Sequence, residues 1–303
     1  MSNSTPSSST ATAAATSTTA STATVAAMAS TRRKRDWPKH LCILALLAIE
    51  LLPFYMMMQI SMKDNHMFFD NPWVPANPLR WVWENWIYAG RLILPYVANS
   101  IVVSVSATVG CLVVALLAAY FFSRYKMPGS GFLWGLFLLL MLLPSVANIV
   151  PLFAVLKGLH LLNTLWALIV LGVAGGQVFC IYLLRNFIED IPRDLFEAAE
   201  MDGASHFQQL RNVVIPMSGP ILGTLAILQF LSNWNDYLMP LIVLRDPEIF
   251  PIGVGLIYLD GEYVKQWGRI MASFFLASIP LIIIFLFTMK LFVKGLSAGA
   301  VKG

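Results

Sequence analysis

Long uninterrupted runs of apolar residues dominate this chain from about residue 41 to its end. A helix that crosses the hydrocarbon core of a bilayer needs roughly 20 apolar residues. Six segments meet this requirement, namely 41–60, 97–122, 132–156, 164–184, 219–244 and 271–293. The runs are continuous rather than alternating, which favours helices over the strands of a barrel. The sequence therefore predicts an all-α polytopic membrane protein with six transmembrane helices.

The composition agrees with this pattern. Of the 303 residues, 58% are hydrophobic and 12% are charged, whereas a soluble domain carries about 25% charged residues. Residues 2–31 differ, because they are almost entirely Ser, Thr and Ala and cannot build a core. We expect a disordered cytoplasmic tail over residues 1–36 and a transmembrane domain over residues 37–303.

The distribution of Lys and Arg predicts the orientation. Cytoplasmic loops carry an excess of these residues, and the cluster Arg32–Arg35 precedes the first span. With the N-terminus inside, the inner segments hold 13 of the 20 Lys and Arg residues. Both termini and the segment 185–218 are then cytoplasmic. Frequent aromatic residues indicate an amphipathic helix on the outer surface over about 79–94.

The chain lacks the usual signatures of catalysis, metal binding or nucleotide binding. Its three cysteines, Cys42, Cys111 and Cys180, lie in apolar segments and fit no metal or disulfide spacing. No Gly-Lys-Ser/Thr phosphate loop is present. The net charge of +4 is spread along the loops and is not a nucleic-acid signal. We expect no enzyme activity, so energy for any transport comes from another chain or from an ion gradient.

A polar helical segment separates the fourth and fifth apolar runs. Pro192 suits the first turn of a helix, and Asp194 and Glu197 lie where negative charge is favoured. Gly203 can end the helix in a left-handed conformation, and a second short helix is expected over about 204–213. Composition alone favours two interpretations equally: a helix that docks a partner protein and an amphipathic helix on the membrane surface.

This segment resembles the EAA loop of ABC importer permeases, which contacts the ATPase subunit. The matching residues are Glu197, Ala198, Ala199, Asp202, Gly203 and Pro216. Other segments are similar to carbohydrate-type permeases, namely Asn99-Ser100, Ala119-Tyr120, Asn163-Thr164 and Trp234-Asn235-Asp236-Tyr237. The closing run 292–303 resembles the tail of the smaller maltose-type permease subunit. The resemblance covers roughly residues 37–303.

The resemblance implies a sugar-translocating subunit in a larger complex. Its partners would be a cytoplasmic ATPase dimer that binds ATP and Mg, a second permease and an extracytoplasmic binding protein. This chain itself would bind no cofactor. The EAA residues would couple ATP hydrolysis to transport, and the tail would reach the ATPase through Lys294, Gly299 and Lys302. A possible substrate pathway is assigned to Trp234, Asn235 and Asp236.

Several alternatives stay open from the sequence. The composition of the segment 245–270, expected on the outer side, favours an ordinary loop and a docking surface equally. The resemblance favours contact with the binding protein. Another ABC solute, such as glycerol phosphate, is a second candidate. An ion-gradient carrier would use intramembrane acids such as Glu50 and Asp236, and a scaffold that only anchors an ATPase would transport nothing.

Overall fold

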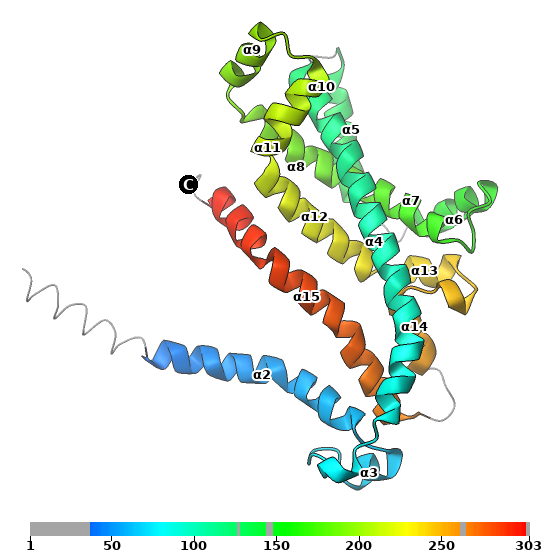
Figure 1. Cartoon of the computed structure of the whole chain (residues 1–303). Helices are drawn as coiled ribbons and strands as arrows, with labels where there is room; N and C mark the ends of the chain where they lie inside the picture. Colours follow the sequence, from blue (N-terminus) through cyan, green and yellow to red (C-terminus); the bar gives the residue numbers. More distant parts are fainter. Residues whose placement is uncertain (1–36, 126–127, 144–147, 261–264, 301–303) are drawn as a thin grey trace, which may run out of the picture. The chain divides into compact units, whose positions relative to one another are not determined.

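The computed structural model describes residues 37–125, 128–143, 148–260 and 265–300, and these residues form helices and their connections (Figure 1). In chain order the elements are α2 (Trp37–Ser61), α3 (Asn65–Asp70), η1 (Pro78–Arg80), α4 (Glu84–Arg124), α5 (Ser130–Leu142), α6 (Ile149–Gly158), α7 (Leu165–Gly175), α8 (Gln177–Glu189), α9 (Arg193–Met201), α10 (His206–Gln209), the π-helical η3 (Leu210–Val214), α11 (Ile215–Met217), α12 (Gly219–Trp234), α13 (Leu238–Val243), η4 (Pro247–Ile249), α14 (Ile252–Asp260) and α15 (Trp267–Ala300).

The chain divides into two units, residues 1–56 and residues 57–303. The described part of the first unit belongs to α2, whose side chains from Trp37 to Pro53 are all exposed, Glu50 included. An apolar helix without a buried face is suited to contact with lipid. Residues 1–36, for which the sequence predicts a disordered tail, lie outside the described residues.

In the second unit, α4 is the helix against which the others pack. It contacts α7, α8, α12, α14 and α15. Small side chains make this close approach possible, because Ala107, Cys111, Ala115 and Ala119 are fully buried along one side of α4. The prediction of a separate amphipathic surface helix over 79–94 is wrong, because most of that segment is the first part of α4, which continues without a break to Arg124.

Breaks in the helices interrupt two of the expected spans, 164–184 and 219–244, within the described residues, and a further bend lies just before the second of them. α7 and α8 meet at an angle of 41°, and α12 follows the helical segment His206–Met217 at 78°. The expected span 219–244 is interrupted between α12 and α13. The described helices include three that are long and apolar enough to cross a membrane, or up to five if each bent pair is one span. The third expected span, 132–156, contains the shorter helices α5 and α6, and residues 144–147 between them are not described.

Side-chain hydrogen bonds to backbone carbonyls fix the segment between α2 and α4. The Nζ of the buried Lys63 donates to the carbonyl of Asn71 at 2.7 Å and to that of Pro72 at 3.3 Å. Burial lowers the pKa of this ammonium. Asn85 Nδ2 donates to the carbonyls of Ser61 and Lys63, each at 2.9 Å. These bonds tie the start of α4 to the end of α2.

Two adjacent glycines, Gly175 and Gly176, lie at the bend between α7 and α8, and the packing requires glycine at Gly176 alone. A Cβ on Gly176 would meet the side chain of Gln229 and would lie 2.7 Å from Cys111 Sγ, whereas a Cβ on Gly175 would meet nothing within 4 Å. The small residues around this bend therefore permit close helix packing, as the sequence indicates. Both glycines can be tested with the same added methyl group.

We expect Gly176→Ala to lower the free energy of unfolding by about 1–3 kcal/mol, because the methyl group overpacks the α4–α8–α12 contact. Gly175→Ala is the matched control and should leave stability equal or slightly higher, since alanine favours helix. Thermal unfolding of the two purified variants in detergent checks this. Equal losses of stability in both variants would contradict the packing argument.

Candidate functional site

The polar segment between α8 and α12 forms a short helix with a defined end. α9 begins at Arg193, directly after Pro192. At its other end the Ala204 amide donates to the carbonyl of Ala199 at 2.9 Å, and the Gly203 amide donates to that of Glu200 at 3.0 Å. Gly203 has a φ of +74°, which confirms the left-handed conformation expected there.

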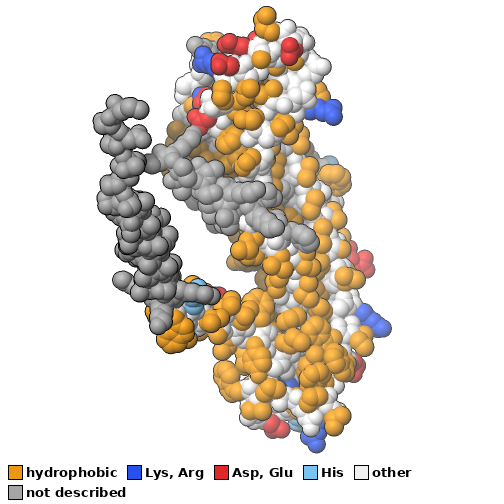
Figure 2. Space-filling model, turned by 60° about the vertical axis from the view of Figure 1, so that its left-hand side comes forward, with side chains coloured by type: hydrophobic (Ala, Val, Ile, Leu, Met, Phe, Trp, Pro, Cys, Tyr) orange, Lys and Arg blue, Asp and Glu red, His pale blue; other side chains and the backbone are white. Residues whose placement is uncertain are grey.

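The surface of this segment combines charged and apolar side chains. Glu197 and Ala198 are exposed on α9. Met201 and Phe207 are 88% and 68% exposed, on either side of the Gly203 turn. Figure 2 shows that charged side chains gather at this end of the molecule, whereas apolar side chains cover most of the middle of the same face. Large exposed apolar side chains among charges are typical of a protein-docking surface.

A buried glutamine ties the segment to the end of α4. Gln209 is 1% exposed, and its Oε1 accepts a hydrogen bond from the Tyr120 hydroxyl at 3.1 Å. Its Nε2 lies 3.5 Å from both Glu200 Oε1 and the Ala204 carbonyl. Loss of this side chain would leave the buried Tyr120 hydroxyl without this partner. The position of α9 is therefore coupled to α4.

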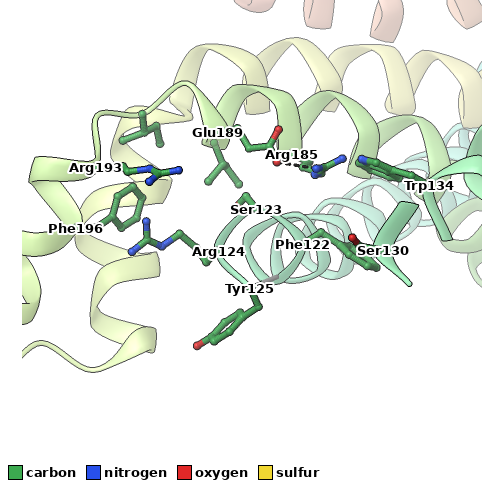
Figure 3. A pocket seen from close by; sticks show the side chains of 12 residues that line it. Phe122, Ser123, Arg124, Tyr125, Ser130, Trp134, Arg185, Glu189, Arg193 and Phe196 are labelled. Atoms are coloured by element: carbon green, nitrogen blue, oxygen red, sulfur yellow. Dashed lines mark ion pairs between the residues drawn. The ribbon is translucent and has the colours of Figure 1, made fainter. Parts of the chain in front are cut away.

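Contacts of α4 with α9 and α10 strengthen this connection. The guanidinium of Arg124 lies 4.1 Å from the centre of the buried Phe196 ring and 3.5 Å from Glu200 Oε1 (Figure 3). The Tyr125 hydroxyl and His206 Nε2 are 3.0 Å apart. The segment from α9 to α11 is thus held on the end of a long helix.

The second short helix differs from the expectation. Instead of one helix over 204–213, the chain forms α10, a π-helical turn and α11 in succession, and Pro216 lies exposed within α11. Ser205 and Gln208 form a capping box at the start of α10. The Ser-x-x-Gln spacing is a readable signal for this start, whereas nothing local in the sequence indicates that the next residue, Gln209, is buried against Tyr120.

A cavity of about 590 Å³ lies in the middle of the second unit, between α4, α7 and α12. Asn235 and Asp236 line it, directly after the end of α12. Trp234 does not line it: this side chain is 4% exposed, packs in the apolar core and stacks on Phe230 with ring centres 5.5 Å apart. The other polar side chains of the lining are Ser100, Ser104, Asn148, Gln229, Ser232 and Asn233.

The remaining expected site residues lie elsewhere. Lys294 and Gly299 fall in the last part of α15, and Lys302 lies outside the described residues. The outer segment 245–270 contains η4 and α14, and the side-chain oxygen of Asn163 accepts from the amides of Arg245 at 2.9 Å and Asp246 at 3.0 Å. Across the described residues, no three His, Cys, Asp or Glu side chains gather as they would around a metal ion.

Comparisons with known proteins connect this geometry to one family. The family model of the binding-protein-dependent transport system inner membrane component matches residues 111–298. A probable ABC transporter permease protein of Pyrococcus horikoshii, PH1036, is 34% identical over 257 residues, which cover 83% of this chain and 92% of the relative. The trehalose transport system permease protein SugB of Mycobacterium tuberculosis is 32% identical, covering 84% of this chain and 93% of its own.

A solved structure shares the fold. The crystal structure of a bacterial ABC transporter involved in the import of the acidic polysaccharide alginate contains a chain that aligns with a TM-score of 0.72 at 24% identity. The alignment covers 84% of this chain and 96% of the other. The family implies a complex with an ATPase and a binding protein, in which this subunit is not catalytic. The chain is an all-helical, multi-pass inner-membrane protein, and it belongs to the permease family of binding-protein-dependent ABC importers.

Proposed function

We propose that this permease moves a sugar, an oligosaccharide or a related polyol, into the cytoplasm, driven by ATP that a separate ATPase subunit hydrolyses. The chemistry of the central cavity carries this proposal. Its lining presents several amide and hydroxyl groups, and among the described residues Asp236 is the one charged side chain in it. Amides and hydroxyls pair with the hydroxyl groups of a sugar, which carry no net charge.

Two groups in the cavity are suited to substrate hydroxyls. The Ser104 hydroxyl is buried and has no hydrogen-bond partner within the described chain. The Asn235 side chain is exposed to the cavity at the end of α12. A phosphorylated solute such as glycerol phosphate would call for Arg or Lys, and neither occurs among the described lining residues. The trehalose permease relative supports the same substrate class.

The alternative of an ion-gradient carrier is not retained, because the family takes its energy from an ATPase. We infer that the segment from α9 to α11 is the ATPase contact and that it lies in the cytoplasm, as the Lys and Arg distribution predicts. Met201 and Phe207 would enter the partner's surface, and Glu197 would pair with a basic residue there. The hydrogen bonds of Gln209 would transmit the ATPase movement to α4.

The remaining partners follow from the resemblance. A second, different permease would complete the channel, and the outer segment 245–270 would face the binding protein. The tail residues Lys294, Gly299 and Lys302 are proposed as further ATPase contacts. With ATP and Mg on the ATPase, this chain needs no cofactor of its own.

One experiment tests the function as a whole. The complex is purified from its native membranes in mild detergent, reconstituted in proteoliposomes with its binding protein and given trehalose, an arabino-oligosaccharide or glycerol phosphate. We expect ATP-dependent uptake of a sugar and none of glycerol phosphate. Uptake of glycerol phosphate alone would reject the sugar. ATP hydrolysis without uptake of any solute would favour the scaffold.

Gly203→Val should uncouple ATP hydrolysis from transport. A β-branched residue at a φ of +74° is strained, at a cost of about 1–2 kcal/mol, so the end of α9 has to change its path. We expect normal membrane insertion and a reduced amount of sugar taken up per ATP hydrolysed. Gly158→Val, at the exposed end of α6 where a Cβ meets nothing within 4 Å, is the control. Wild-type coupling in Gly203→Val would reject this role for the turn.

Asn235→Ala should weaken sugar transport without changing the fold. The side chain lines the cavity and makes no hydrogen bond within the described chain, so its removal takes away a substrate contact alone. We expect KM for the sugar to rise by about 5–10-fold, as for the loss of one hydrogen bond. Asn186→Ala, at an exposed asparagine of α8 outside the cavity, is the control. An unchanged KM in Asn235→Ala would remove this residue from the pathway.

A further inference from the structure

A second cavity, of about 350 Å³, lies apart from the central one. It is formed where α4 and α8 end and where α5 and α9 begin (Figure 3). Its lining includes three arginines, Arg124, Arg185 and Arg193, together with the aromatic residues Trp134 and Tyr125. Its volume falls in the range of about 300–1,000 Å³ that is usual for small-ligand pockets.

The charges in this cavity are unbalanced. Arg185 pairs with Glu189 at 2.8 Å and lies 4.2 Å from the centre of the Trp134 ring. Arg124 is 3.5 Å from Glu200, which is a long and partly exposed contact. Arg193 forms no ion pair with any of the described residues. Glu189 is the one carboxylate among the described lining residues, so the cavity carries a net positive charge.

Donor groups in the cavity also lack acceptors. Arg185 Nε is buried and has no hydrogen-bond partner within the described chain. α5 begins beside it, after Gly129, with neither a side-chain cap nor an acidic residue in its first turn. Ser130, the first residue of this 13-residue helix, lines the cavity, so the uncapped positive end of the helix lies at it. An anion with several oxygens would satisfy the guanidinium and the helix start together.

We propose that this cavity binds a phosphate group. Guanidinium groups match the geometry of phosphate oxygens in a bidentate manner. Three of them line this cavity: Arg124 and Arg193 lie beside Phe196, and Arg185 lies beside Trp134 (Figure 3). The phosphate can come from the headgroup of an anionic phospholipid or from a phosphate ion in solution. In both cases Arg193 supplies a charge that no residue of the described chain neutralises.

The surroundings favour the lipid as the source. α5 leads away from the cavity, and Phe132, Leu136 and Leu139 are exposed along it at 79%, 41% and 57%. Acyl chains attached to the phosphate can lie on this apolar surface. Trp134 is at the cavity itself, and tryptophan concentrates at the membrane–water interface. Basic pockets between helices on the cytoplasmic side bind anionic headgroups in this way. The leaflet depends on the proposed orientation, whereas the phosphate chemistry does not.

The test is a calorimetric titration of the full chain, purified in detergent with its partner subunits. The probes are dioctanoyl-phosphatidylglycerol, dioctanoylglycerol, which lacks the phosphate, and inorganic phosphate. We expect saturable binding of the phospholipid and none of dioctanoylglycerol. Arg193→Gln should weaken the binding by about tenfold, as for the loss of one charged hydrogen bond. Arg80→Gln removes the same charge from an exposed position outside the cavity and outside the α9–α11 segment, and it should leave the affinity unchanged.

Each result is informative, and none depends on transport of sugar. Binding of inorganic phosphate that is as tight as that of the phospholipid and equally sensitive to Arg193→Gln would identify a soluble phosphate as the ligand. Absence of binding for both phosphate probes, or equal losses in Arg193→Gln and Arg80→Gln, would overturn the proposal. If Arg193→Gln instead releases the ATPase and leaves the phospholipid affinity unchanged, the proposal is also overturned. Arg193 would then pair with an acidic residue of the ATPase. Equal unfolding temperatures of the two variants verify that the fold is intact.

Discussion

Close packing against α4 is the constraint on which the second unit depends. The axes of α7, α8 and α12 can approach this helix closely because the side chains between them are small. Ala107, Cys111 and Ala115 are fully buried there. The middle of α4 contributes Ser104 to the central cavity, and its last turn holds the docking segment through Tyr120. A rigid helix thus links the two regions that a transporter has to coordinate. A movement of α9 that alters the contacts of Tyr120 would therefore act on α4, the same helix that contributes Ser104 to the cavity.

A second constraint applies at the bends, because polar backbone groups within a membrane need hydrogen-bond partners inside the protein. Gln177 Nε2 donates to the carbonyls of Cys111 at 3.2 Å and Val173 at 2.9 Å, next to the break between α7 and α8. Gln229 Nε2 donates to the Gly172 carbonyl at 3.0 Å. These amides therefore have structural partners, which distinguishes them from Asn235 at the end of α12. Polar residues in an apolar span are not all substrate contacts.

The positions of most apolar helices and the end of α9 could be predicted from the sequence, because a long apolar run and a glycine in a turn each have a local physical cause. Gly203 is left-handed as its residue type suggests. The sequence places Trp234 in the pathway together with Asn235. In the structure its ring stacks on Phe230, one helical turn earlier, and does not line the cavity, whereas Asn235 does. Which face of an all-apolar helix is buried depends on packing. The burial of Gln209 is equally non-local, since its partner Tyr120 is 89 residues away.

Two residues of α9, Arg193 and Phe196, line the arginine-lined cavity, and this has a thermodynamic consequence for the proposed phosphate site. Arg124 and Phe196 line the cavity, and the guanidinium of Arg124 also contacts Glu200 on α9. A phosphate that attracts Arg124 competes with Glu200 for the same guanidinium. If the ATPase docks on α9 and the cavity binds phosphate, as we propose, the two events would be reciprocally coupled: ATPase docking would alter phosphate affinity by the same factor by which phosphate alters docking. The exposed, 3.5 Å contact with Glu200 is the weaker partner in this competition, so a bound phosphate would loosen α9 from α4 at Glu200 while the buried Gln209–Tyr120 bond keeps the segment attached.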